Sequence, residues 1–361
     1  MLRKCLATAF LAAAISPAAR TAQPKAPRFE EPPIVRPGDA HRPRLPFTIR
    51  GHTDWLPTLY EGFRSEDAVV RARCAFIAGQ VGNLSAADEL RVLLKDPDRD
   101  VRAQAGVALG YLGDEKATGA AAAVLVDGPG WRRVYAAHAL AKIGTPRALA
   151  LLKRNREKQP PMVAETIDAI LAPDGQKPES RGWEVEDAPI EVGDAKPPPM
   201  KVGTVIDAAV DHLWRLVDVY WHEGKHEQCI RLDLTIAFLD PTFIEAYSTA
   251  GWLAWSAGRG DEGLRIYLDG LHANPNQYDM YYEVAFHYFN IRQWTTAARY
   301  FRKATEFECP DYVPRMLAHS LERAGRLEEA YAVWEDLLKK TPDNQIVIIN
   351  HDRVKKLLAD E

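Results

Sequence analysis

The chain has 361 residues, 47% hydrophobic and 27% charged, which is typical of a folded globular protein with room for two or three domains. Its formal net charge of −4 lacks the basic excess usual in proteins that bind nucleic-acid phosphates, so no nucleic-acid partner is expected. The 25 prolines are unevenly distributed, and the Pro-rich stretches mark boundaries between segments.

The first segment of the chain predicts export. Arg3 and Lys4 precede a short apolar run at 5–16, and small residues follow around Ala18. A positive start, a short apolar run and small residues are the features of a secretory signal peptide, so we expect residues 1–22 to be one. The run is too short for a permanent membrane-spanning helix, and no later segment is long and apolar enough to form one.

A regular repeat runs through the first half of the chain. The stretches VRARCAFIAGQVG (70–82), VRAQAGVALGYLG (101–113) and RRVYAAHALAKIG (132–144) align without gaps, and we call their spacing the shorter period. Each has small or apolar residues at helical spacing and ends in Gly, which often terminates a helix. A second apolar stretch follows each Gly, so the predicted unit is two helices joined by a turn; these second stretches lie at 86–94, 117–125 and 146–152.

This pattern resembles the short HEAT-like repeats, of the type also found in phycobilisome lyases. The resemblance implies a helical solenoid over residues 53–171, opened by a helix near Trp55 and closed by a helix over 161–171. No bilin-attachment site accompanies the repeats, so no lyase activity is carried over.

Three arginines recur at one position of this unit: Arg71, Arg102 and Arg133. Binding of an anionic ligand is one role for such a row. The sequence favours the other role, in which they cap helix ends or pair with acidic neighbours. Those neighbours are Asp67, Asp98 and Asp100.

The second half of the chain repeats with a wider spacing, which we call the longer period. Equivalent turns are marked by Gly224, Gly258, Arg292 and Gly325, and successive units close at Pro241, Pro275, Pro310 and Pro342. Together with a small residue early in the unit and an aromatic late in it, this resembles the tetratricopeptide repeat. The resemblance implies four helix pairs over 204–342 and a capping helix over 343–361.

The first tetratricopeptide-like unit is the most divergent. Val217 stands where Gly or Ala is usual, and Asp233 stands where an aromatic is usual. Upstream of this unit, residues 172–203 are rich in Pro, Gly and charge, which predicts a disordered linker, and residues 23–52 predict a flexible lead-in of the same kind. The expected fold is therefore all-α, with two helical-repeat solenoids joined by a flexible linker.

The pentapeptide HEGKH at 222–226 matches the His-Glu-x-x-His pattern of zinc peptidases, in which Glu223 would be the general base. That chemistry requires both histidines on one continuous helix, whereas the repeat register places Gly224 at a turn. Glu245 has the spacing of a third zinc ligand, but the same register places it at the start of the next helix. We therefore expect no metal, no cofactor and no catalytic residue, with a zinc metallopeptidase kept as an alternative.

Large aromatic residues recur on the first helix of the tetratricopeptide-like pairs, the helix that lines the concave groove in such arrays. Surface aromatics anchor protein or peptide partners, and they also stack on sugar rings. The alternative is that the rings belong to the core between helices. The predicted partner-binding groove consists of Trp214, Trp221, His222, Trp252, Trp255, Tyr282, Phe286 and Phe289, flanked by the acidic Asp218, Glu245 and Asp279.

The function expected from these features is non-catalytic. An exported scaffold or adaptor would bind a protein or peptide in the aromatic groove, in assembly of the bacterial cell envelope. The short export signal favours the periplasm, with secretion as the other destination. A glycan-binding module that uses the same aromatics is the alternative from a different class.

Overall fold

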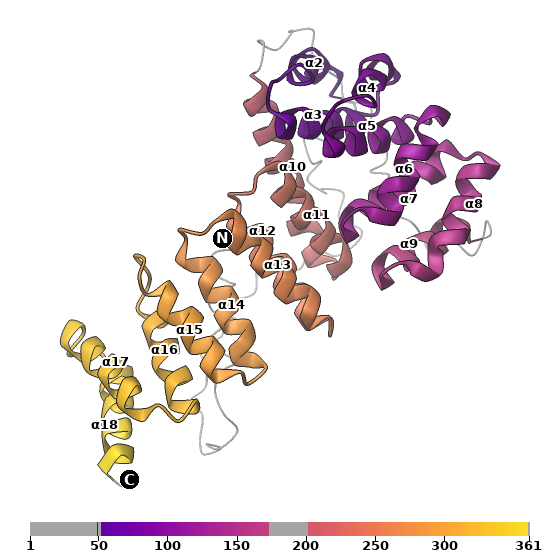
Figure 1. The fold of residues 1–361 in the computed structure, drawn as a ribbon. Helices are drawn as coiled ribbons and strands as arrows, with labels where there is room; N and C mark the ends of the chain where they lie inside the picture. Colours follow the sequence, from indigo (N-terminus) through magenta and orange to yellow (C-terminus); the bar gives the residue numbers. More distant parts are fainter. Residues whose placement is uncertain (1–48, 50–51, 173–200, 360–361) are drawn as a thin grey trace, which may run out of the picture. The chain divides into compact units, whose positions relative to one another are not determined.

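The computed structural model describes residues 49, 52–172 and 201–359 (Figure 1). All regular structure in these ranges is helical, which confirms the predicted all-α class. The predicted signal peptide, nearly all of the lead-in and residues 173–200 of the predicted linker lie outside the described residues. None of the described helices is long and apolar enough to cross a membrane.

The first array consists of helix pairs α3/α4, α5/α6 and α7/α8, with α2 before them and α9 after them (Figure 1). These pairs lie where the shorter period predicts them. The bounds are η1 Thr53–Trp55, α2 Leu56–Gly62, α3 Ala68–Val81, η2 Leu84–Ala86, α4 Ala87–Leu93, α5 Arg99–Tyr111, η3 Glu115–Ala117, α6 Thr118–Asp127, α7 Gly130–Ile143, α8 Pro146–Asn155, η4 Arg156–Lys158 and α9 Pro161–Leu171.

Small residues allow the first helices of neighbouring units to approach closely. A Cβ atom added at Gly79 of α3 would lie 2.6 Å from the Cα of Ala108 in α5. One unit later, a Cβ atom added at Gly110 of α5 would lie 2.6 Å from the Cβ of Ala139 in α7. The same contact therefore recurs with the shorter period, and it explains why the aligned stretches contain so many small residues.

The second array consists of the pairs α10/α11, α12/α13, α14/α15 and α16/α17, followed by α18 (Figure 1). Helix α10 begins at Val202, inside the segment predicted as linker. The bounds are α10 Val202–His222, α11 His226–Leu239, α12 Ile244–Ser256, α13 Gly260–Ala273, α14 Tyr278–Asn290, α15 Trp294–Ala304, α16 Tyr312–Arg323, α17 Leu327–Lys340 and α18 Gln345–Ala359.

The four aligned turns of this array share one backbone conformation. Gly224, Gly258 and Gly325 have φ angles of 70°, 80° and 73°, in the left-handed region that glycine adopts without steric cost. Arg292 occupies the equivalent turn with φ of 63°, and among the described residues it is the one non-glycine with positive φ. The backbone thus confirms the predicted alignment of the four turns, including the turn where Arg stands in place of Gly.

The two arrays share a hydrophobic core, which sequence analysis did not predict. Phe238 of α11 lies between rings of the first array, with its centroid 6.0 Å from Phe76 and 5.6 Å from Trp131. The Arg132 guanidinium lies 4.8 Å from the same ring. Arg73 Nε also donates to the Phe238 carbonyl oxygen at 2.9 Å.

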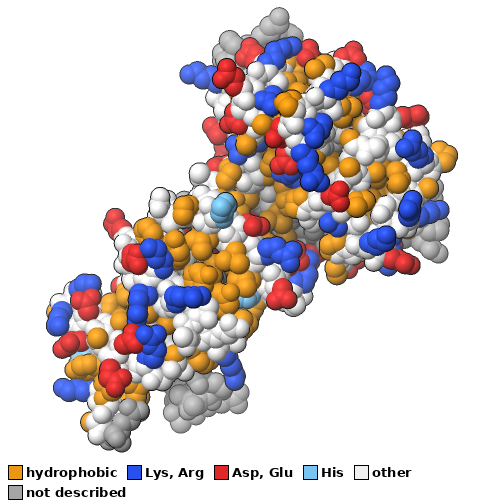
Figure 2. Space-filling view, in the orientation of Figure 1, with side chains coloured by type: hydrophobic (Ala, Val, Ile, Leu, Met, Phe, Trp, Pro, Cys, Tyr) orange, Lys and Arg blue, Asp and Glu red, His pale blue; other side chains and the backbone are white. Residues whose placement is uncertain are grey.

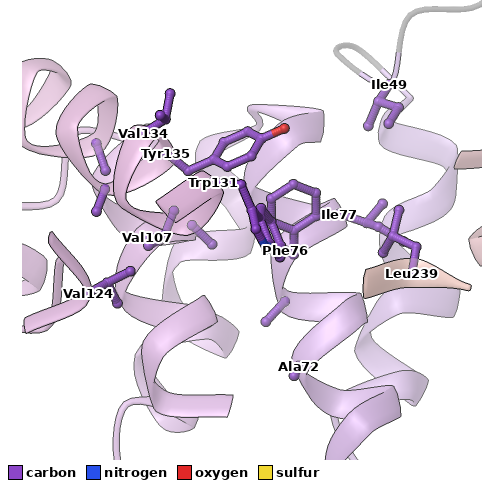
Figure 3. Close-up of a cluster of buried hydrophobic side chains, with 14 of the residues drawn as sticks. Ile49, Ala72, Phe76, Ile77, Val107, Val124, Trp131, Val134, Tyr135 and Leu239 are labelled. Atoms are coloured by element: carbon purple, nitrogen blue, oxygen red, sulfur yellow. The ribbon is translucent and has the colours of Figure 1, made fainter. Parts of the chain in front are cut away.

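The buried cluster around this contact contains side chains from both arrays, including Ile77 of α3 and Leu239 of α11 (Figure 3). Within it, Phe76 and Trp131 each meet the ring of Tyr135 edge to face. The two arrays therefore pack directly against one another.

The divergent first unit carries an ionisable group in its core. Asp233 is fully buried, and neither of its carboxylate oxygens has a hydrogen-bond partner. Burial disfavours the charged form, so the pKa of Asp233 is raised well above its ordinary value. Val217, the other unusual residue of this unit, is an ordinary buried side chain.

The last helix is attached through the half-buried carboxylate of Glu322 on α16. Glu322 accepts hydrogen bonds from Trp334 Nε1 of α17 at 2.9 Å and from Arg353 Nη2 of α18 at 2.6 Å. Val347 and Val354 of α18 are buried. The helix thus covers the apolar end of the array, the part expected of a capping helix.

Candidate partner-binding site

The HEGKH pentapeptide lies across a break between two helices. Helix α10 ends at His222, the chain turns at Gly224, and α11 begins at His226. His222 Nδ1 lies 2.8 Å from the Asp218 carbonyl oxygen, and the His226 ring lies 6.1 Å from that of Trp221. The two histidines therefore do not share a continuous helix, the arrangement that zinc binding by this motif requires.

No metal-binding constellation replaces that motif in the described ranges. Among residues 49, 52–172 and 201–359, no three His, Cys, Asp or Glu side chains are grouped so as to hold a metal ion. Cys74 and Cys229 are buried, and burial raises the pKa of each thiol to about 12. Neither thiol is therefore a reactive nucleophile near neutral pH.

The predicted groove residues lie on α10, α12 and α14, the first helices of three successive pairs. The structure brings residues of different repeats together. The rings of Trp221 on α10 and Trp252 on α12 have centroids 5.6 Å apart, at an interplanar angle of 33°. On α10 itself, Trp214 lies 5.0 Å from Phe243, the residue that precedes α12.

Exposure divides these residues into two groups. Trp255 is 37% exposed and His222 is exposed, while Trp214, Trp221, Trp252 and Tyr282 are half-buried. We call these six residues the aromatic face. Their rings combine ordered packing on one side with surface that a partner can reach.

Phe286 and Phe289 form the second group. They are only 9% and 5% exposed, which leaves their rings little surface for a partner. Phe286 stacks on Tyr282 at 5.8 Å, and the Arg323 guanidinium lies 4.7 Å from the Phe289 ring. For these two residues the burial matches the core alternative, in which the aromatics pack between helices.

The aromatic face is accompanied by acidic residues at one position of the repeat. Asp211, Glu245 and Asp279 occupy the same place in the longer period, on α10, α12 and α14. Sequence analysis named the last two but missed Asp211, although its spacing was available as a signal. It also missed Glu283, whose only distinguishing feature is its burial.

Glu283 follows Tyr282 of the aromatic face on α14, and its pKa is raised. Burial, with a smaller contribution from the charge of Asp279, raises the pKa of Glu283 to about 8. A hydrogen bond involving Ser248 of α12 acts in the opposite direction. The raised pKa of Glu283 therefore reflects mainly the removal of its carboxyl group from water, and only in small part the charge of Asp279.

The aligned arginines of the first array are engaged within the protein. Arg71 donates to both carboxylate oxygens of Asp96, at 2.8 and 3.0 Å, and this hydrogen bonding is the main cause of the lowered pKa of Asp96. Arg102 donates to the carbonyl oxygens of Asp96 and Pro97, and Arg133 to that of Gly128. These contacts match the structural role that the sequence favoured.

The acidic partners differ from the expected pairing. Asp67 and Asp98 accept hydrogen bonds from backbone N–H groups at the starts of α3 and α5, so they cap those helices. Asp100 pairs with Arg132, at 3.1 Å, and not with one of the aligned arginines.

Hydrophobic side chains also reach the surface of the second array. Figure 2 shows them gathered over α12 and α14 on one face of the molecule, beside Lys and Arg side chains. Exposed apolar patches on a folded protein are typical of interaction surfaces.

A family model described as HEAT repeats matches residues 56–137. A comparison with curated proteins found no match. Among solved structures, a thermophilic TPR protein of Thermus thermophilus is 16% identical, with a TM-score of 0.33, over 42% of this chain and 88% of that chain. The pilF protein of Pseudomonas aeruginosa is 14% identical, with a TM-score of 0.30, over 73% of this chain and 99% of that chain.

Similarities at these TM-scores carry no argument about function. The repeat periods, the shared turn conformations and the matched HEAT repeats establish the architecture independently. The chain is a helical-repeat protein, with HEAT-like repeats followed by tetratricopeptide-like repeats.

Proposed function

We propose that this protein is a non-catalytic, exported adaptor that binds a protein or peptide partner on the aromatic face. The observation that carries the proposal is the Trp221–Trp252 ring pair, which joins two repeats, with Trp255 exposed on α12. Helical-repeat scaffolds present extended surfaces of this kind to partners, and Trp is among the residues most enriched in binding hot spots.

The packing of these rings favours tight binding. Half-buried side chains such as Trp221 and Trp252 are already ordered by their neighbours. A partner that covers them loses little side-chain entropy on binding, a cost of about 0.5–1.5 kcal/mol for each freely rotating side chain that it must immobilise. For the same buried area, a partner therefore binds more tightly to an ordered aromatic surface than to one whose side chains are mobile.

The proposed location is the periplasm of a bacterial cell, with a part in assembly of the cell envelope. The support is the charged start, short apolar run and small residues of positions 1–22. Fractionation of the source organism, followed by mass spectrometry of the N-terminus of the mature protein, tests this part.

The binding proposal is tested by crosslinking in the source organism and capture with Trp255→Ala. The expected result is loss of the specific partner, because the change removes an exposed ring without opening a core cavity. Leu268→Ala on α13 is the matched control, since Leu268 is 38% exposed and lies outside the aromatic face. If Trp255→Ala captures the partner as well as the wild type does, the binding proposal is contradicted.

A glycan ligand would use the same rings through stacking on sugar faces. Affinity electrophoresis in gels containing polysaccharide separates this ligand class from peptides. Retardation of the wild type that is lost in Trp255→Ala would replace the peptide proposal with a glycan one. Metal analysis of the purified protein addresses the peptidase alternative, which requires stoichiometric zinc that His226→Ala removes.

A further inference from the structure

We propose that the junction between the second and third tetratricopeptide-like repeats is a hinge that opens when Glu283 loses its proton. The opening changes the aromatic face, because Trp252 and Trp255 of α12 lie before the junction and Tyr282 of α14 lies after it. This consequence for a partner rests on the proposed function, whereas the hinge itself does not.

One end of the junction is closely packed and apolar. Met280 of α14 is fully buried, and its sulfur lies so near Gly270 of α13 that a Cβ atom at position 270 would collide with it. Tyr247 of α12 also borders Gly270. The connection between α13 and α14, residues 274–277, adjoins this end. Hinge rotations are absorbed by a few residues at the ends of elements, so this end is suited to be the pivot.

Farther along α14 the junction contains polar groups that the packing leaves unsatisfied. Oε2 of Glu283 and Nδ1 of His287 are buried, and neither has a hydrogen-bond partner in the described part of the chain. The His287 ring lies 6.4 Å from that of Tyr267 on α13. A buried polar atom without a partner costs free energy, so these atoms favour an arrangement in which water reaches them.

The junction is also less extensive than those on either side of it. Helix α14 packs on α13 over fewer residues than α12 packs on α11 or α16 packs on α15. On α13, the positions that face Met280 and His287 are Gly270 and Gly260, which have no side chain to contribute. Less apolar contact therefore holds this junction closed.

Glu283 is the group in the junction that is suited to control the opening. It interacts with groups from four helices: Ser248 of α12, Tyr267 of α13, Asp279 and Tyr282 of α14, and Tyr312 of α16. Burial raises the pKa of the three tyrosines above their ordinary value and lowers the pKa of His287, in each case away from the range in which Glu283 ionises. The charge of Asp279 opposes ionisation of Glu283.

Ionisation of Glu283 favours the open state, because water solvates the carboxylate there. In the closed state burial raises the pKa of Glu283 to about 8, and in the open state the pKa approaches its ordinary value of 4.5. The proton therefore stabilises the closed state fully below the lower value, and this stabilisation is lost as the pH rises to the higher one. The ratio of closed to open molecules should fall roughly a hundredfold between pH 6 and pH 9.

The test measures distances across the junction in the full chain. Ser256→Cys on α12 and Thr295→Cys on α15 carry nitroxide labels, since both positions are exposed, and Cys309→Ser removes the half-buried native thiol. The thiols of Cys74 and Cys229 are buried and stay unlabelled. Double electron–electron resonance at pH 6 and pH 9 gives the distribution of distances between the labels. We expect one narrow distribution at pH 6 and an additional, longer distance at pH 9.

Two substitutions of Glu283 and two controls assign the effect. Glu283→Gln removes the ionisation and should keep the pH 6 distribution at pH 9. Glu283→Met should do the same with an apolar side chain, so the test remains available if circular dichroism shows that the amide disturbs the fold. Glu308→Gln removes an exposed carboxylate after α15, and this variant should open as the wild type does. Labels at Thr295→Cys and Glu328→Cys span the junction between α15 and α16, where the distance should not change with pH.

The outcomes separate the hinge from the proposed function. Equal distributions at pH 6 and pH 9 in the wild type overturn the hinge, and so does an opening that persists in both variants of Glu283. If the hinge opens but Trp255→Ala leaves capture of the native partner unchanged, the proposed function fails and the hinge stands. The effect on the aromatic face predicts weaker capture at pH 9 than at pH 6, and equal capture by the wild type at both pH values overturns that effect.

Discussion

The hydroxyl group of Tyr135 on α7 lies 2.9 Å from Oγ1 of Thr235 on α11, and this contact joins the two arrays. Thr235 Oγ1 donates its own proton to the carbonyl oxygen of Arg231, at 2.8 Å. Because a hydroxyl group has one proton, Thr235 must accept from Tyr135. The two hydrogen bonds therefore run in one direction, from Tyr135 of the first array through Thr235 to the backbone of the second array. They lie in a buried interface that also contains the rings around Phe238.

This interface predicts that the arrays unfold together. Phe238→Ala removes the half-buried ring that lies between Phe76 and Trp131, and it should destabilise the protein by about 3 kcal/mol, the lower end of the range for truncating a buried aromatic. Differential scanning calorimetry should then show two separated transitions where the wild type shows one. Leu268→Ala, at an exposed site, should leave one transition. Two transitions in the wild type would contradict the shared core.

Arg292 predicts a stabilising substitution. Its φ of 63° costs a residue with a Cβ atom about 1–2 kcal/mol that glycine does not lose. Arg292→Gly should therefore raise the melting temperature by a few degrees. The greater conformational entropy of glycine in the unfolded chain offsets part of this gain. Gly258→Ala at the equivalent turn, with φ of 80°, is the reciprocal control and should lower it. A lower melting temperature in Arg292→Gly would show that the side chain has an overriding contact.

Asp233 predicts a stability that falls with rising pH. Its pKa is raised by burial, so the folded state holds the proton more tightly than the unfolded chain. The stabilising contribution of that proton is present below the unfolded pKa and is lost as the pH rises toward the folded pKa. Asp233→Asn keeps the shape and removes the ionisation.

Melting temperatures across pH 4.5 to 8 should therefore decline less in Asp233→Asn than in the wild type. At neutral pH the variant should be more stable than the wild type, because the unfolded chain no longer gains free energy by ionising residue 233; the amide still lacks a hydrogen-bond partner, so that cost remains. The exposed Asp336→Asn serves as the control for the loss of one charge. Parallel pH profiles for wild type and Asp233→Asn would show that the carboxylate does not titrate in this range.

For Glu322, on α16 near the C-terminal end of the second array, we expect the stability to fall as the pH falls, the opposite of the effect of Asp233. Burial opposes its ionisation, but hydrogen bonds involving His319, Trp334 and Arg353 outweigh that effect, so the pKa of Glu322 is lowered. Its contribution is present above the unfolded pKa and is lost as the pH falls through the folded value.

Glu322→Gln should loosen α18, because a neutral amide replaces the carboxylate that pairs with Arg353. Hydrogen exchange followed by mass spectrometry should show faster exchange over Gln345–Ala359, by roughly tenfold for a loss of about 1.4 kcal/mol. The amides of α4, far along the chain, provide the internal control. Unchanged protection of α18 would mean that its apolar contacts alone hold it in place.

The sequence by itself determined the helices, their pairing and the turns between them. Each depends on contacts within one repeat or between neighbours, and such contacts recur with the period. The longer period thus predicted a turn at Arg292, and the shorter period predicted the turns at Gly113 and at the equivalent glycines of the neighbouring units. The same register showed that Gly224 would interrupt HEGKH.

Only the tertiary structure decided which side chains are available and how the arrays meet. Phe286 and Trp252 occupy the same register position, yet one is buried and the other half-buried, because burial depends on the helices beside each repeat. The Tyr135–Thr235 contact joins residues that are 100 positions apart and belong to repeats of different period. No periodic pattern encodes such a pair, since a contact that occurs once leaves no repeated signal in the sequence.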